Sequence, residues 1–121
     1  MKKTKMLKKN YEFRYVLSKG TYYSGKNIEA FIKKSNKNYN LLGIAIGTKI
    51  TNAVNRNKIK RLIRENYRLN EQKILNGYSI VFLWKKKSDI ENATFNNIKK
   101  DMLKIFDKAE IIEETEWNTF L

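Results

Sequence analysis

The sequence predicts an α+β fold, a two-layer α/β sandwich in which helices pack on one mostly antiparallel sheet. Two segments, 28–34 and 41–50, have the composition of neighbouring strands joined by a short polar turn. From residue 52 the apolar period changes to that of a helix, and a third strand at 78–84 and a last helix follow. This order of elements is typical of one sheet covered by helices.

The first regular element is expected to be a short amphipathic helix in NYEFRYVLSKG. Phe13, Val16 and Leu17 recur at helical spacing. Asn10 can cap the start of the helix and Gly20 can end it. The segment TYYSGKN that follows is interpreted as a loop or a short strand.

The next two segments are expected to pair as a hairpin. The alternation of IEAFIKK places Ile28, Ala30 and Ile32 on one face of a strand. Phe31 falls on the opposite, polar phase, so its ring is expected to point away from the main core. LLGIAIGTKI is almost continuously apolar, as in a central strand, and the polar cluster SNKNYN between the two segments predicts a turn.

A long basic helix is predicted from Asn52 to near Gly77. On a helical wheel the apolar residues occupy one arc and the cationic residues the other, which is a strong amphipathic pattern. The apolar arc holds Ile59, Leu62, Ile63 and Tyr67, and the cationic arc holds Arg56, Lys60, Arg64 and Arg68 with Arg61 beside them.

A last helix is expected after the strand YSIVFLW. Ser88 or Asp89 can cap its start. Its apolar face is expected to consist of Ile98, Met102, Leu103, Ile105 and Phe106.

The charge of the 121-residue chain points to a polyanionic partner. The net charge is +14 at pH 7, which favours nucleic acid or an anionic membrane. Residues 1–106 carry 25 basic and 7 acidic groups, whereas residues 107–121 carry one basic and five acidic groups. We therefore expect a single basic α/β domain at 1–108 and an acidic C-terminal tail at 109–121.

The composition also disfavours several function classes. The chain has no cysteine and no histidine, so it lacks thiolate and imidazole metal ligands and the commonest general base. A protein metal nuclease would need a carboxylate cluster, but Asp89 and Glu91 suit a helix cap, and Glu113, Glu114 and Glu116 lie in the expected tail. We expect no catalytic protein side chain.

A membrane role is disfavoured as well. No apolar run approaches the ~20 residues that span a bilayer, and the apolar face of the basic helix is needed for the core. The expected location is the cytoplasm.

Four of the five arginines fall within the basic helix, where a rigid guanidinium fork can grip phosphate in a way that lysine cannot. Only Glu65 and Glu71 are available there as acidic partners, so a solvated face of paired charges is disfavoured. We predict nucleic-acid contact for this face. Asn55 and Asn57 flank Arg56, and either helix capping or contact with a phosphate or base edge explains them.

The stretch NAVNRNKIKRLIRENYR resembles the signature of the bacterial ribonuclease P protein family, Arg-Asn-Arg followed by Ile-Lys-Arg-Leu-Ile-Arg. The matching residues here are Arg56, Asn57 and Lys58, and then Ile59 to Arg64. The opening LKKN, the turn at Gly20, the strand GIAIGTKI that enters the helix and the strand–helix ending extend the likeness over most of the chain.

The resemblance implies a ribosomal-protein-like domain with a left-handed βαβ crossover, against the usual right-handed preference. In that family the protein binds a catalytic RNA, and the RNA removes the 5′ leader from precursor tRNA. The implied partners are therefore the ribonuclease P catalytic RNA and precursor tRNA. The implied cofactor is Mg²⁺, held mainly by RNA in the holoenzyme, and the protein alone is expected to be a monomer.

The resemblance also assigns two sets of site residues, although Phe13 and Leu17 equally suit ordinary core packing. The RNA-subunit set is Arg56, Asn57, Lys58, Lys60, Arg61, Arg64 and Arg68, and the set for the precursor-tRNA leader is Phe13, Leu17, Phe31 and Lys49.

The chain departs from the family pattern in three places. Lys58 replaces an arginine and loses the bidentate fork, and Leu17 stands where an aromatic residue is common. WKKKSD and the acidic tail have no counterpart; the tail is disordered, packs through Trp117 and Phe120, or screens the basic surface. The alternative class is a ribosomal or RNA-chaperone protein without a role in cleavage, which the order of the motifs disfavours.

Overall fold

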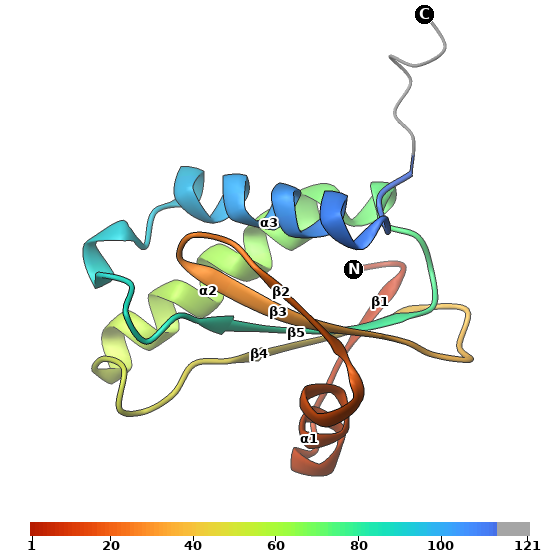
Figure 1. Cartoon of the computed structure of the whole chain (residues 1–121), viewed down its shortest axis with the longest axis horizontal. Coiled ribbons are helices and arrows are strands. Elements are labelled where there is room, and N and C mark those ends of the chain that lie inside the picture. The colour runs from red at the N-terminus through yellow and green to blue at the C-terminus, as the bar shows by residue number, and fades with distance from the viewer. Residues whose placement is uncertain (114–121) are drawn as a thin grey trace, which may run out of the picture.

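The computed structural model describes residues 1–113 and consists of a five-stranded sheet with three α-helices (Figure 1). The strands are β1 (Thr4–Met6), β2 (Thr21–Ser24), β3 (Ile28–Lys34), β4 (Asn40–Ala45) and β5 (Tyr78–Trp84). The helices are α1 (Asn10–Lys19), α2 (Ala53–Asn70) and α3 (Phe95–Ala109), with short 3-10 turns at Glu71–Lys73 and Ile90–Asn92.

The sheet confirms the α+β class and is evenly mixed. Its strand order is β1-β4-β5-β3-β2, with β1/β4 and β4/β5 parallel and β3/β5 and β2/β3 antiparallel. The expectation of a mostly antiparallel sheet therefore overstated the antiparallel share. The β4–α2–β5 unit is a parallel crossover, as the family resemblance implied. Its left-handed sense stays a prediction.

The predicted hairpin between β3 and β4 is wrong, because β5 lies between them. Ile80 of β5 is in register with Ile32 of β3 on one side and with Leu42 of β4 on the other. β5 carries consecutive buried residues, including Val81 and Phe82, and is covered on both faces. A strand that is apolar on both faces buries more of its apolar surface in the centre of a sheet than at an edge, so the centre is the favoured position. The local turn after β3 did not decide the pairing.

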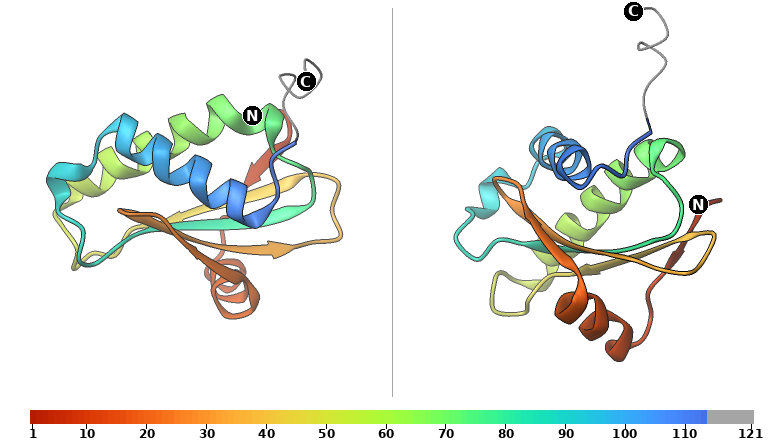
Figure 2. Two further views of the ribbon diagram at one scale, coloured as in Figure 1. Left: turned by 45° about the horizontal axis from the view of Figure 1, so that its top comes forward. Right: turned by 45° about the vertical axis from the view of Figure 1, so that its right-hand side comes forward.

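Helices cover both faces of the sheet, rather than one as the two-layer prediction held. α2 and α3 lie on one face and α1 lies alone on the other (Figures 1 and 2). The main core forms between the sheet and α2 and α3 and includes Ile32 and Tyr67. A smaller core forms under α1 around Val16 and Val81. Phe31 packs on this second core, so the prediction that it points away from the main core is confirmed.

The ends of two helices differ from the predictions. The N-cap of α1 is Lys9 rather than Asn10, and Glu12 completes it by accepting from the Lys9 backbone N–H at 3.0 Å. α2 ends at Asn70 rather than near Gly77. The buried residue Ile74 lies beyond this end and forms an isolated antiparallel bridge with Ile112 instead of continuing the helix.

The last helix is capped neither by Ser88 nor by Asp89. Thr94 Oγ1 accepts from the Asn97 backbone N–H at 3.2 Å and begins α3. Asp89 instead caps the short 3-10 turn by accepting from Glu91 N–H at 3.0 Å. The predicted apolar face of α3 is otherwise confirmed, with four of its residues buried and Leu103 half-buried.

The folded body continues beyond α3 into the expected tail. Ile111 is buried in the main core, and Ile112 forms an antiparallel bridge with Ile74. Glu113 N–H donates to the Lys73 carbonyl at 2.7 Å. The possible roles of Trp117 and Phe120 lie outside the described residues. No helix in residues 1–113 is long and apolar enough to cross a membrane.

β1 is held to the body by polar contacts that no sequence pattern revealed. Thr4 Oγ1 and Tyr67 Oη are hydrogen-bonded at 2.7 Å in the interior. The buried Glu71 carboxylate accepts from the backbone N–H groups of Lys2 and Lys3, each at 3.2 Å. Three residues flanked by lysines are too few to show strand periodicity, so only the tertiary contacts define this strand.

Tyr67 makes the stability of the fold sensitive to alkaline pH. Burial raises the pKa of Tyr67 from 10.0 to about 12. Between these values the unfolded chain releases the phenolic proton before the folded chain does, so the free energy of unfolding falls as pH rises. Between about pH 9 and pH 12 the natural protein is expected to lose roughly 2–3 kcal/mol of its free energy of unfolding through Tyr67, at about 1.4 kcal/mol per pKa unit. The Tyr67→Phe protein has no phenolic proton at this position and is expected not to show this loss.

Urea unfolding of both proteins across this pH range measures the effect. Because the two proteins differ only at residue 67, the difference between the two curves isolates Tyr67. Parallel curves would contradict the prediction.

Candidate nucleic-acid interface

The start of α2 is fixed by a polar cap that orients the basic helix. Asn52 Oδ1 accepts from the Asn55 backbone N–H at 2.9 Å, and Asn55 Nδ2 donates to Thr51 Oγ1 at 3.1 Å. Asn55 is thus engaged within the cap, which answers one half of the question that the sequence left open. Asn57 is exposed on the helix surface and is free of this cap.

The predicted RNA-subunit residues form one exposed cationic face on α2. Within residues 1–113, the single ion pair joins Arg61 Nε to Glu65 Oε1 at 3.8 Å, and the Arg61 side chain is still 65% exposed. Pairs of this exposure contribute about 0–1 kcal/mol, so the face keeps its charge for an external anion. Asn57, Lys58, Arg61, Arg64 and Arg68 are exposed, and Arg56 and Lys60 are half-buried.

Arg56 has a structural contact that the motif did not reveal. Its Nη1 donates to the Thr51 carbonyl at 2.6 Å and to the Thr48 carbonyl at 3.3 Å. The guanidinium therefore ties the turn after β4 to the first turn of α2, and its other N–H donors remain for a phosphate. Lys49 lies exposed in the same turn.

The predicted leader residues other than Lys49 gather on the opposite face of the sheet, beside α1. Phe13, Leu17 and Phe31 are all half-buried against the smaller core. Gly43 of β4 allows this close approach, because a Cβ there would lie 2.6 Å from Phe13 Cε1 and 3.0 Å from Leu7 Cδ1. Phe13 and Leu17 thus pack on the core and also keep accessible surface.

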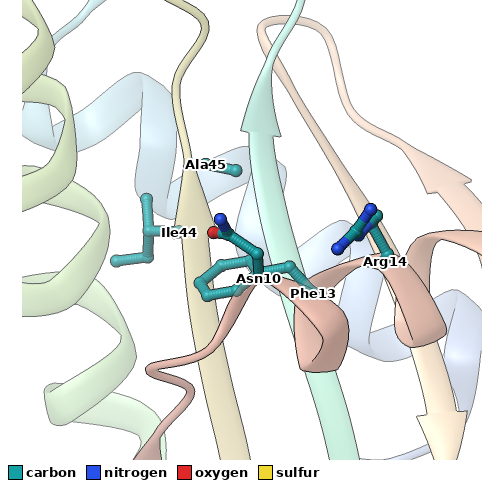
Figure 3. A pocket seen from close by; sticks show the side chains of 5 residues that line it. All are labelled: Asn10, Phe13, Arg14, Ile44 and Ala45. Carbon is teal, nitrogen blue, oxygen red and sulfur yellow. The ribbon is translucent and has the colours of Figure 1, made fainter.

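A cavity of about 490 Å³ opens beside Phe13, between α1 and the end of β4 (Figure 3). Arg14, the one arginine outside the α2 cluster, lines it with a guanidinium that Figure 3 shows extending from α1 over the sheet. An aromatic ring beside a cation suits a flexible single strand of nucleic acid. Lys49 is not among the lining residues, which are Asn10, Phe13, Arg14, Ile44 and Ala45.

The sequence did not point to two residues on the α1 side of the sheet, Arg14 beside Phe13 and Tyr22 beside Phe31. The Tyr22 ring centroid lies 5.2 Å from that of Phe31, and its hydroxyl donates to Glu29 Oε2 at 2.5 Å. The hydrogen bond to Glu29 raises the pKa of Tyr22. Register pairs Tyr22 with Phe31 across β2 and β3, a contact that the sequence did not reveal because TYYSGKN was interpreted as a loop or a short strand without a pairing partner.

The described residues do not fit a protein-held Mg²⁺ site. Over residues 1–113, no three or more of the Asp, Glu, His and Cys side chains gather into a group that could hold a metal ion. The buried Asp101 carboxylate already accepts from three backbone N–H groups, those of Lys26, Asn27 and Ile28.

Fold and surface together define a small basic α+β protein with a cationic helix on one face of its sheet and an aromatic-lined cleft on the other. The family model of ribonuclease P matches residues 1–110. The chain belongs to the ribonuclease P protein family, the protein component of a ribonucleoprotein endoribonuclease. This membership decides against the ribosomal or RNA-chaperone alternative.

Comparisons with known proteins agree with this assignment. The chain is 42% identical over 107 residues to the ribonuclease P protein component of Clostridium botulinum, covering 83% of this chain and 96% of that protein. It is 33% identical over 108 residues to that of Natranaerobius thermophilus, covering 89% and 92%. Among solved structures, the Staphylococcus aureus RNase P protein superposes with a TM-score of 0.78 at 27% identity, covering 89% and 97% of the two chains. The Thermotoga maritima RNase P protein gives 0.76 at 26% identity, covering 86% and 96%.

Proposed function

We propose that this chain binds the catalytic RNA of ribonuclease P with the basic face of α2 and the 5′ leader of precursor tRNA with the cleft beside α1. The RNA subunit carries out the hydrolysis that releases the leader and leaves the mature 5′ end. The protein acts as a monomer in the cytoplasm. The observation that carries this proposal is the exposed row of guanidinium groups on α2, of which one makes an exposed ion pair within residues 1–113.

The α2 face would assist the RNA by electrostatics. Folding a catalytic RNA brings phosphates together, and the fixed cations of α2 would offset their repulsion and release counterions. The RNA phosphates would hold the Mg²⁺ ions, and the protein would lower the magnesium concentration that the holoenzyme needs. The guanidinium fork adds geometry to this charge, because it can bind one phosphate through two parallel hydrogen bonds.

The cleft would add affinity for the substrate without a demand on its sequence. Bases would stack on Phe13 and Phe31 through their π-faces, and Arg14 would supply charge for the backbone. This suits a leader, whose sequence differs from one precursor to the next. Mature tRNA has no leader and cannot use the cleft.

Cleavage of a precursor tRNA by the cognate catalytic RNA, at low Mg²⁺, tests the proposal directly. The expected result is faster cleavage at the mature 5′ end when the protein is present, and no cleavage by the protein alone. Absence of stimulation, despite tight binding of the RNA, would sink the proposal.

A second prediction concerns the cleft. Phe13→Ala is expected to weaken binding of precursor tRNA to the holoenzyme by about tenfold, since one stacked base contributes about 1–3 kcal/mol. Arg14→Gln is expected to weaken it by a similar factor, since a charge-assisted hydrogen bond to phosphate contributes about 1.5–3 kcal/mol. Binding of mature tRNA is expected to stay unchanged in both variants. Arg14 is exposed, so Arg14→Gln tests the cleft without disturbing the packing of α1.

The measurement is the equilibrium affinity of the holoenzyme for the two tRNA forms at one salt concentration. The charge-matched control is Lys99→Gln, an exposed position on α3 at the other face of the sheet. Equal losses for precursor and mature tRNA would show that the cleft does not hold the leader.

A further inference from the structure

α1 has a second groove on its other flank. Residues two apart in an α-helix point about 160° away from each other. Arg14 therefore faces the cavity at the end of β4, whereas Glu12 faces a different one at the beginning of β4. That second cavity has a volume of about 550 Å³ and is lined by Lys5, Met6, Lys8, Lys9, Glu12, Tyr39 and Leu41.

Tyr39 in this groove is surrounded by cations. Lys5 Nζ lies 4.5 Å from the Tyr39 ring centroid, and Lys37 Nζ lies 5.8 Å from it. The parallel pairing of β1 with β4 brings these residues together, with Lys5 in register with Leu41. An aromatic ring within reach of two ammonium groups offers both a stacking surface and charge for a phosphate backbone.

The acidic group in this groove is already engaged. Glu12 Oε1 accepts from the Lys9 backbone N–H at 3.0 Å and from that of Lys8 at 3.4 Å, as part of the α1 cap. The two lysine side chains stay exposed. The groove therefore presents cations outward and keeps its carboxylate directed at the backbone.

Tyr11 connects the two flanks over the outer surface of α1. It is 62% exposed, and Lys9 Nζ lies 5.8 Å from its ring centroid. Tyr15, one helical turn further on, is 55% exposed as well. Large aromatic side chains this open to water, interleaved with lysines, are typical of surfaces that bind single-stranded nucleic acid.

We propose that the Lys5–Tyr39 groove binds a second segment of single-stranded RNA, the part of the precursor leader that lies upstream of the nucleotides held beside Phe13. The strand crosses α1 at Tyr11 and stacks a base on Tyr39, while Lys5, Lys8 and Lys9 contact its phosphates. This inference rests on the proposed leader cleft and extends its footprint to the opposite flank of α1.

Leader length tests the inference. Because α1 with its side chains is about 10 Å wide, a leader of about four nucleotides reaches one flank and a leader of about fourteen reaches both. We expect the holoenzyme to bind the long-leader precursor about tenfold more tightly than the short-leader precursor. In the double variant Lys5→Gln, Tyr39→Leu this gain is expected to disappear, with the short-leader affinity unchanged. Lys99→Gln is the control and should keep the gain.

The outcomes separate this inference from the proposed function. A long-leader gain that survives in the double variant, or an equal loss for both leaders, overturns the second groove. The second groove is also overturned if the natural protein binds long-leader and short-leader precursors equally well. In that case the cleft beside Phe13 is still upheld if the short-leader precursor binds more tightly than mature tRNA. If short-leader precursor and mature tRNA bind equally, the cleft itself fails.

Cross-linking gives a readout that does not depend on affinity. A photoreactive nucleotide at the upstream end of the long leader is expected to attach to the segments 5–11 or 37–39. Attachment confined to α2 or α3 would overturn the inference.

Discussion

Replacing Arg61 and Arg64 together by alanine is expected to weaken binding of the catalytic RNA by roughly 100-fold. Both side chains are exposed on α2, and the one ion pair there is exposed and weak. Each charge-assisted hydrogen bond to phosphate contributes about 1.5–3 kcal/mol, and about 1.4 kcal/mol corresponds to a tenfold change in affinity. Neither side chain is buried, so the fold should be unaffected.

The salt dependence of RNA binding provides a second test of the Arg61 and Arg64 contacts. Each phosphate contact contributes about 0.7–0.9 to the slope of log affinity against log salt, so the double variant should lose about 1.4–1.8 of that slope. An unchanged slope would contradict the electrostatic account of the α2 face.

Lysine at the same two positions separates fork geometry from charge. The Arg61→Lys, Arg64→Lys protein keeps both charges and loses the bidentate fork. We expect its affinity to fall about tenfold while its salt slope stays near that of the natural protein. Affinity equal to the natural protein would show that charge alone matters, and that the clustering of arginines on α2 has another cause.

Asp101→Ala is expected to lower the free energy of unfolding by about 3 kcal/mol or more, the largest loss of stability that we predict for a single side chain. Asp101 is 5% exposed, and its carboxylate accepts from backbone N–H groups at the β2–β3 turn and the start of β3, at 2.7 Å from Asn27 and at 3.0 and 3.1 Å from Lys26 and Ile28. Truncation leaves the N–H donors of Asn27 and Ile28 without partners in the interior, at about 1–3 kcal/mol for each unsatisfied group, whereas Lys26 is exposed.

The turn also fits tightly against this carboxylate, since a Cβ on Gly25 would lie 2.7 Å from Asp101 Cβ and Cγ. Urea unfolding measures the loss, and Asp107→Ala, at an exposed position on the same helix, is the control with an expected change below about 0.5 kcal/mol. A loss below about 1 kcal/mol for Asp101→Ala would mean that water replaces the carboxylate at the three donors.

The parts of the fold that were predicted correctly are those with a strong local pattern. α2 was located from its apolar arc and β5 from its apolar run, because burial on one helical arc or on both faces of a strand leaves a periodic signature. Phe31 was placed on the correct face from alternation alone. These features depend on residues near each other in the chain, and one sequence is enough to show them.

The incorrect predictions concern partners distant in the chain. The β3–β4 hairpin failed because β5 outcompetes β4 as the partner of β3, a choice between strands that no local pattern encodes. β1 was missed because three residues show no periodicity, and Tyr67 and Glu71 hold it from α2 and the turn beyond. The N-cap of α3 is Thr94 rather than Asp89, because Asp89 caps the short 3-10 turn that precedes the helix.

The candidate site divides in the same way. The α2 face follows directly from helical spacing in the motif, so its residues could be named from the sequence. The cleft could be named only through the family resemblance, and that route missed Arg14 and Tyr22 because they meet Phe13 and Phe31 through packing and strand register.

By itself, the sequence determined that this protein is a basic α+β domain of the ribonuclease P family with an arginine-rich helix, because charge, motif and periodicity are properties of neighbouring residues. Only the tertiary structure decided the strand order, the placement of α1 alone on its face, and the two grooves that flank it. The physical reason is that those features depend on which buried surfaces pair across long separations. The cation–π contact between Lys5 and Tyr39 exists because β1 pairs with β4, and that pairing is stabilised by residues of α2 and the turn after it.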